Sequence, residues 1–249
     1  MLEFSVVYTD RALNHMSSNF QQVMKDCSSV LKEAYNAHST AIIPGSGTYA
    51  MEAVVRQLTP SPAPSASAPL IIRNGWFSFR WTQIYSAAYP MISPVVMKAR
   101  RVVCGSGQNG SSCSNCDGVS CGCGGSTNAG SCTTCKGQCT AESIASCPCA
   151  PFAPPPIQIV VEHIRSTRPP LVFAPHVETS TGIMLSNDYI KQLAAAASEV
   201  GGMLVLDCIA SGCMWVDMRA LGVDVIVTAP QKGWSGEHVV PVIPLLTPS

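Results

Sequence analysis

Apolar residues recur at helical spacing in several stretches of this chain, and short apolar runs lie between those stretches. The helical spacing covers residues 16–35, 51–58, 157–164 and 189–200, and a further helix is expected to begin near Phe77. Each of these stretches is long enough to form two or more turns. They therefore predict helices that each bury one face against a common core.

The short apolar runs between these helices are typical of buried strands. They lie at 70–72, 171–174, 203–206 and 223–228, and residues 91–101 indicate one more extended segment. Strands that alternate with helices favour parallel pairing, because the helix carries the chain back across the sheet. We therefore predict an α/β fold with helices on both faces of a mostly parallel, doubly wound sheet.

The alternation is interrupted once, by a tract rich in glycine, serine and cysteine. Ten of the 13 cysteines lie between Cys104 and Cys149, so they belong to an insertion rather than to a disulfide framework for the whole fold. We divide the chain into a first part of a large domain at 1–101, the insertion at 102–149, a second part at 150–236, and a tail at 237–249 that matches no recognisable pattern.

The insertion has two possible interpretations. Cys113-x2-Cys116 and Cys132-x2-Cys135 are separated by fifteen residues, a spacing found in zinc ribbons. A tract with few apolar residues is also typical of low-complexity sequence without a fold, and a translated intron would give the same composition. A zinc-binding insertion therefore remains one alternative.

Overall composition favours small-molecule chemistry. The formal net charge is zero and only 12% of residues are charged, so no basic surface for nucleic acid or anionic lipid is expected. Glu199 and Asp207 interrupt the longest apolar stretch, which is then too short to cross a bilayer. The first residues lack the pattern of a secretory signal, so we expect a cytoplasmic protein.

Polar residues that suit chemistry follow the predicted strands. Asn74-Gly75, the segment 176–182, Asp207 and Gln231-Lys232 each come directly after an apolar run. In parallel sheets, ligands bind beyond the carboxyl ends of the strands. A lysine at this edge, partly desolvated, has a neutral amine able to bond to an aldehyde cofactor. The alternative is an ordinary surface lysine.

Three further features fit pyridoxal 5'-phosphate (PLP), and each has a purely structural alternative. Asp207 ends a strand, where it would either pair with a cationic ring nitrogen or cap a helix. The turn at 45–48 opens a helix, so it would either bind phosphate or only cap that helix. Trp76 and Phe77 would either stack on a planar ring or fill the core.

Five motifs in this order resemble the class V aminotransferases, which are fold-type I PLP enzymes, in particular the alanine-glyoxylate and serine-glyoxylate branch. The resemblance covers roughly residues 14–101 and 150–236 and rests on PGSGTYAMEA, NGWFSFRW, APHVETSTGIML, MLVLDCIAS and DVIVTAPQKGW.

The resemblance implies PLP as cofactor, a homodimer with its sites at the subunit interface, and a role for each matched residue. It makes Lys232 the Schiff-base lysine and proton shuttle, and Asp207 the partner of the ring nitrogen. Phe77 falls on the stacking position, although one gap would place Trp76 there. The remaining matches are Ser46, Gly47, Thr48 and Gln231 toward the phosphate, Thr179 near the phenolic oxygen, and Ile209 under the ring.

The implied reaction moves an amino group from alanine or serine to a 2-oxo acid such as glyoxylate or pyruvate. Members of the family continue well past the lysine, into a C-terminal domain whose arginine binds the substrate carboxylate, and no residue here matches that arginine. We therefore expect a truncated chain, in which turnover suffers more than cofactor binding and the lysine bonds to PLP poorly. Two alternatives are another PLP reaction, such as that of a lyase or desulfurase, and a non-catalytic remnant whose insertion binds zinc.

Overall fold

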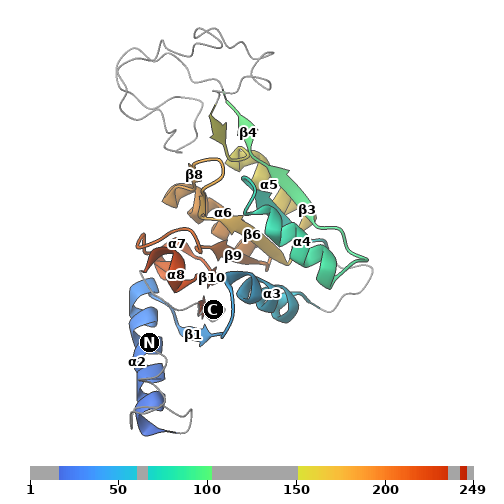
Figure 1. The fold of residues 1–249 in the computed structure, drawn as a ribbon. Helices are drawn as coiled ribbons and strands as arrows, with labels where there is room; N and C mark the ends of the chain where they lie inside the picture. The colour runs from blue at the N-terminus through green and yellow to red at the C-terminus, as the bar shows by residue number, and fades with distance from the viewer. Residues whose placement is uncertain (1–16, 61–66, 103–150, 235–241, 246–249) are drawn as a thin grey trace, which may run out of the picture.

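The computed structural model describes residues 17–60, 67–102, 151–234 and 242–245 (Figure 1). Its centre is a seven-stranded sheet with the order β1-β11-β10-β9-β6-β2-β3. Five neighbouring strands are parallel, and β11 pairs antiparallel with both β10 and β1. The parallel strands are β2 (Leu70–Arg73), β3 (Val95–Lys98), β6 (Leu171–Pro175), β9 (Met203–Asp207) and β10 (Val225–Val227), and the other two are β1 (Ser39–Ile42) and β11 (Val242–Leu245).

Helices cover both faces of the sheet, as the alternating pattern predicts. Successive residues of a strand point to opposite faces, so Leu70 and Ile72 of β2 enter one core while Ile71 enters the other. The first face is covered by α5 (Ile157–Thr167), α6 (Asn187–Glu199), α7 (Met218–Leu221) and the end of α2 (Ser18–Tyr35), and the second by α3 (Gly47–Leu58) and α4 (Phe79–Ala88). The predicted α/β fold is confirmed.

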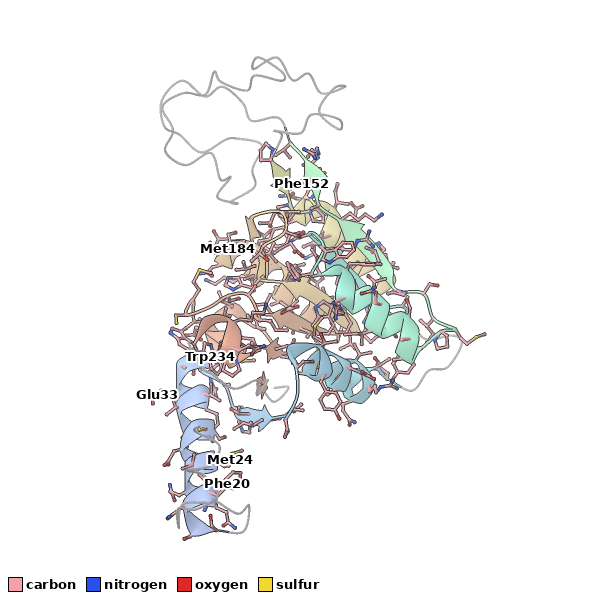
Figure 2. All side chains as sticks on the ribbon, in the orientation of Figure 1. Phe20, Met24, Glu33, Phe152, Met184 and Trp234 are labelled. Carbon is pink, nitrogen blue, oxygen red and sulfur yellow. The ribbon has the colours of Figure 1, made fainter. Side chains whose placement is uncertain are left out.

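Helix α2 packs on the body only through its C-terminal part. Ser17 caps its start, and Asn36 ends it in the left-handed conformation. Leu31 and Tyr35 are buried, whereas the outer turns that carry Phe20 and Met24 extend away from the sheet (Figure 2). The docked end of α2 therefore lies beside the segments that follow β9 and β10.

Several short elements have no counterpart in the sequence prediction. Strands β1 and β11 are four residues each, and β11 falls in the tail that the sequence leaves without an element. A strand this short shows too few residues for a period to stand out. The others are α7, β5 (Phe152–Ala153), β7 (Val177–Glu178), β8 (Ile183–Met184) and α8 (Pro230–Gly233), whereas β4 (Arg100–Arg101) falls within the extended segment predicted at 91–101.

The β4–β5 pair lies on either side of the predicted insertion. Arg101 is opposite Phe152 in an antiparallel register, so the chain leaves the body and returns to it at adjacent positions. The cysteine pairs lie outside the described residues, and their zinc interpretation therefore stays a prediction. Within the described ranges, no group of three or more histidine, cysteine, aspartate or glutamate residues is placed to hold a metal ion. No helix among these residues is both long and apolar enough to span a bilayer.

Candidate functional site

One cavity of about 430 Å³ lies at the carboxyl ends of the parallel strands. Its volume is within the range typical of small-molecule sites. All nine residues that the resemblance assigns to the cofactor line this cavity, although they come from five separate parts of the sequence. They are Ser46, Gly47, Thr48, Phe77, Thr179, Asp207, Ile209, Gln231 and Lys232.

The start of α3 forms one wall. Ser46 is the N-cap, and its Oγ accepts a hydrogen bond of 3.3 Å from the backbone N–H of Tyr49. The first backbone N–H groups of a helix have no intrahelical partner, so they are free to bind an anion. Gly47 packs against Ile209, where an added Cβ would lie 2.7 Å from Cδ1. A larger residue at this position would force the end of the Ile209 side chain to move.

Asp207 is oriented by two neutral donors. Trp81 Nε1 donates to its Oδ2 at 3.0 Å, and the backbone N–H of Ile209 donates to its Oδ1 at 3.1 Å. Trp81 is itself fully buried and stacks on Phe173 with 4.7 Å between ring centroids. Among the described residues no lysine or arginine forms an ion pair with Asp207. The carboxylate is therefore held in place without a cation.

Burial raises the pKa of Asp207 to about 6, against the hydrogen bonds from Ile209 and Trp81, which lower it. The negative charge of Glu178 adds to the increase. Asp207 is therefore mostly ionised at neutral pH and gains from any cation brought to it. A protonated ring nitrogen is such a cation.

The raised pKa gives Asp207→Asn a testable pH signature. Because the folded pKa exceeds the ordinary value of 3.8, the stability that Asp207 contributes is present below 3.8 and is lost as the pH rises through about 6. We expect Asp207→Asn to gain stability relative to wild type between about pH 4 and pH 7. Urea unfolding of both chains across this range measures the difference in their unfolding free energies. A difference that does not change with pH would contradict the raised pKa of Asp207.

The short turn that carries Lys232 is held in position by contacts with residues outside the turn. An added Cβ on Gly233 would overlap the Cα of Gly212, and Cys213 Sγ lies 3.0 Å from the carbonyl oxygen of Gly233. Trp234, the next residue, packs against Trp215 and Tyr35, with centroid distances of 5.8 and 6.3 Å. The end of α2 thus supports the lysine turn (Figure 2).

Lys232 itself is exposed. The expectation of a partly desolvated amine is therefore wrong for the chain alone, because the single turn α8 leaves Lys232 exposed although it lines the cavity. Gln231 differs from its neighbour, since its Oε1 is buried without a hydrogen-bond partner in the described structure. A buried acceptor without a partner is costly, so this oxygen is available to an N–H or O–H donor of a ligand, whereas a phosphate would need the Nε2 donor of the same amide.

Glu178 joins two sides of the cavity through a set of hydrogen bonds that we call the Glu178 network. Its carboxylate accepts from the Oγ and the backbone N–H of Ser78 at 2.7 and 2.8 Å, from the N–H of Phe77 at 3.2 Å, and from Ser180 Oγ at 2.6 Å. Glu178 is fully buried. Burial raises its pKa, but the hydrogen bonds from Ser180, Ser78 and Phe77 outweigh burial and hold the pKa below its ordinary value. The network therefore fixes the turn at residues 75–78, which we call the aromatic turn, to the 176–182 loop.

The network settles which aromatic residue faces the cavity. Phe77 lines it, whereas Trp76 is 71% exposed and does not. Gly75 allows this arrangement, because an added Cβ there would overlap Ser180 Oγ and lie 2.7 Å from Glu178 Cγ. The stacking role of Phe77 stays a prediction.

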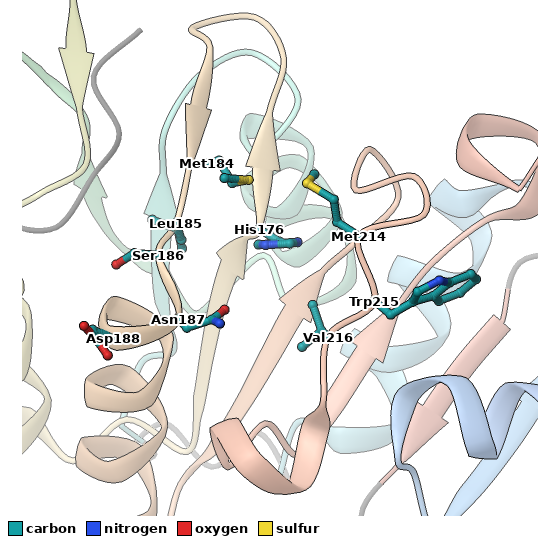
Figure 3. Close-up of a pocket in the computed structure, with 9 residues that line it drawn as sticks. All are labelled: His176, Met184, Leu185, Ser186, Asn187, Asp188, Met214, Trp215 and Val216. Carbon is teal, nitrogen blue, oxygen red and sulfur yellow. The ribbon is translucent and has the colours of Figure 1, made fainter. Parts of the chain in front are cut away.

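A second cavity of about 350 Å³ lies beside His176 and contains none of the nine predicted residues (Figure 3). His176 is buried, and its Nδ1 is 2.8 Å from Ser211 Oγ. Burial lowers its pKa, which favours the neutral ring at neutral pH. Its visible role is to tie the end of β6 to the segment after β9.

Sequence reasoning missed Trp81, Glu178 and Arg80 as contributors to the site. Trp81 holds Asp207, Glu178 holds the loops, and Arg80 lines the cavity. Trp81 and Arg80 stand in the NGWFSFRW motif and Glu178 in the 176–182 loop. The only signal for them was therefore their place within segments that the resemblance had already marked.

Solved aminotransferase structures match nearly the whole chain in fold. The ureidoglycine-glyoxylate aminotransferase of Bacillus subtilis matches with a TM-score of 0.66 and 15% identity, over 98% of this chain and 48% of its own. The alanine-glyoxylate aminotransferase of Nostoc sp. gives 0.63 and 17%, over 94% and 48%. An aspartate aminotransferase of Thermus thermophilus gives 0.61 and 21%, over 94% and 50%.

No family model and no curated protein matches the chain by sequence. The chain spans about half the length of the solved structures that it matches. At these identities the likeness establishes the fold, and the chemistry has to be argued from the cavity. The fold agrees with the one that the sequence motifs imply. The chain therefore has the fold-type I architecture of the PLP-dependent aminotransferases.

Proposed function

We propose that this chain binds PLP in the 430 Å³ cavity and takes part in amino transfer between a small amino acid and a 2-oxo acid. The observation that carries the proposal is the convergence on one cavity of all nine residues that the motifs assign to the cofactor. The parallel sheet brings these five parts of the sequence to one edge, and the residue types that line the cavity there are those that the motifs assign to the cofactor.

Three features of the cavity fit the cofactor. Lys232 lines it with a primary amine, and Asp207 is a carboxylate without a cation among the described residues. Gly47 brings the free N–H groups of α3 to the cavity wall. An anionic phosphate, a cationic ring nitrogen and an aldehyde that bonds to an amine would satisfy α3, Asp207 and Lys232 in turn.

When bound, PLP supplies an aromatic ring that accepts the electrons left on the substrate α-carbon after it loses a proton. The chain supplies the groups that position and protonate. Lys232 would hold the cofactor and move a proton at the α-carbon, while Asp207 would keep the ring nitrogen protonated. Phe77 would cover one ring face and Ile209 the other, and the Thr179 hydroxyl would donate to the phenolic oxygen.

The names of two solved structures with this fold support a proposal for the substrate class. Two of them are named for glyoxylate as acceptor, with ureidoglycine or alanine as donor. We propose alanine or serine as donor and glyoxylate or pyruvate as acceptor. Phe77 is 54% exposed at the edge of the cavity, which leaves it available to a partner, and we propose a second copy of this chain.

The assembled cavity also revises the expectation that Lys232 bonds to PLP poorly. All nine residues of the predicted set line one cavity of this chain, which supports the proposal that it binds PLP without further segments. Substrate binding is a separate question, because no residue of the cavity matches the carboxylate-binding arginine of the family.

A single-turnover assay tests the proposed reaction. The PLP-loaded chain is mixed with alanine or serine and no acceptor, and the 2-oxo acid is measured by chromatography. We expect one equivalent of pyruvate from alanine per bound PLP at most, and none from the chain without PLP. Bound PLP that yields no 2-oxo acid from either donor would contradict amino transfer while leaving cofactor binding intact.

A further inference from the structure

Arg80 is a cavity residue to which neither the motifs nor the sequence gives a role. It is the second residue of α4, and its side chain lines the cavity. Its Nη1 donates a hydrogen bond of 3.2 Å to Thr48 Oγ1 in the first turn of α3. Helices α3 and α4 pack together through a shared core that includes Met51 and Trp81. Arg80 therefore reaches from one helix to the free N–H groups at the start of the other.

The guanidinium of Arg80 lacks the kind of partner that neighbouring arginines have. Arg73 lies 4.7 Å from the ring centroid of Phe79, and Arg56 forms an ion pair with Glu52 at 2.7 Å. In the part of the chain that the structure describes, no carboxylate forms an ion pair with Arg80. Among the described residues, the guanidinium donates its one side-chain hydrogen bond to the Thr48 hydroxyl. A neutral acceptor of this kind is a weaker partner than an anion.

The charges of the cavity indicate what Arg80 would bind. Arg80 and Lys232 are the two cations among its described lining residues, and Asp207 is the one acid. If Lys232 bonds to the cofactor aldehyde, its amine is used in that bond and is not a phosphate ligand. Arg80 is then the remaining side-chain cation for an anion that carries nearly two negative charges.

We propose that Arg80 binds the cofactor phosphate together with Thr48 and the start of α3. This inference rests on the proposed function, because it concerns the same cavity. The phosphate would replace the Thr48 hydroxyl as the main acceptor for the guanidinium, and the hydroxyl would then donate to the phosphate as well. Arginine suits this role because its paired N–H groups match two phosphate oxygens.

The test compares PLP with pyridoxal, which has the same ring and aldehyde but no phosphate. Affinities of both are measured by absorbance titration of the whole chain, as wild type, Arg80→Gln and Arg80→Lys. We expect Arg80→Gln to weaken PLP binding about tenfold and to leave pyridoxal unchanged. Arg80→Lys is expected to recover part of the loss. Because Arg80 is exposed, circular dichroism should show an unchanged fold for both variants.

Arg56→Gln is the matched control, because it removes the same charge from α3 at a site that does not line the cavity. It should bind both compounds as wild type does. Equal affinities of wild type and Arg80→Gln for PLP would overturn the assignment, as would equal losses for PLP and pyridoxal. If Arg80→Gln lost affinity only for alanine or serine and bound PLP as wild type does, Arg80 would instead bind the substrate carboxylate. Wild-type chain that binds neither compound would contradict the proposed function, and the assignment of Arg80 with it.

Discussion

Lys232→Ala is expected to abolish the visible absorbance of the PLP-loaded chain and to weaken PLP binding by roughly 100-fold or more. The loss follows from removing the only lysine among the described residues that line the cavity. The fold should not change, because Lys232 is exposed and substitutions at exposed sites without special contacts typically shift stability by no more than about 0.5 kcal/mol. Absorbance titration and thermal unfolding measure the two effects.

Lys191→Ala is the control for this variant. Lys191 is an exposed lysine of α6 and does not line the cavity, so its removal should change neither PLP binding nor stability. A Lys232→Ala chain that keeps the visible absorbance would show that PLP bonds elsewhere. A loss of fold in Lys232→Ala would mean that the lysine has a structural role that the structure does not show.

Glu178→Ala should cause a large loss of stability, in contrast to Lys232→Ala, which should leave stability unchanged. We expect a loss of about 3 kcal/mol or more in unfolding free energy, because two buried donors of Ser78 and two partly buried donors lose their carboxylate acceptor. These donors belong to Ser78, Phe77 and Ser180. The aromatic turn should then separate from the 176–182 loop, so that PLP binding weakens as well. Urea unfolding and PLP titration measure the two effects.

Glu178→Gln removes the charge of this side chain and keeps its size, so it measures the contribution of the charge alone to stability. The folded pKa of Glu178 is lowered, so the stability from its charge is present above the ordinary value of 4.5 and is lost as the pH falls through the folded pKa. The stability difference between wild type and Glu178→Gln should therefore shrink in acid.

Glu199→Ala is the matched acid control for Glu178→Ala. Glu199 pairs with Arg165 on the surface at 2.9 Å, with more than half of each side chain exposed, and such pairs contribute about 0–1 kcal/mol. Its removal should leave the cavity unchanged. If Glu178→Ala costs no more than Glu199→Ala, the Glu178 network does not hold the two loops together.

The sheet could be predicted from sequence because its core strands are short runs of large apolar residues with clear boundaries. Leu171–Pro175 and Met203–Asp207 are buried on both faces, so their pattern does not depend on a partner. The ends of these strands then located the cavity, since parallel strands end at the same edge of a sheet. Lys232 and Asp207 could be placed together on this argument alone.

The missed features depend on contacts between distant residues. The donor to Asp207 comes from Trp81, which is 126 positions away, and the donors to Glu178 from Ser78 are 100 positions away. Nothing local to Glu178 shows that it is buried, because the same residue in an open loop would be solvated. The exposure of Lys232 was missed for a related reason, since the length of α8 and the openness of the cavity appear only in three dimensions.

Strands β1 and β11 show the same limit within the sheet. Ser39–Ile42 has two polar residues followed by two apolar ones and shows no strand period, and its register is set by pairing with Val242–Leu245, some 200 residues later. No pattern within either segment indicates the other. Parallel strands joined by helices were predictable, whereas the antiparallel strand that closes one side was not.

Reductive trapping of the whole chain with PLP tests the central claim most directly. Borohydride fixes an aldehyde to the amine that it has bonded to, and peptide mass spectrometry then identifies the labelled lysine. We expect one PLP per chain, on the peptide that contains Lys232, and no such label when Lys232 is alanine. Label spread over the other lysines at similar levels, or no label on Lys232 in a chain that binds PLP, would contradict the claim that this cavity is a PLP site.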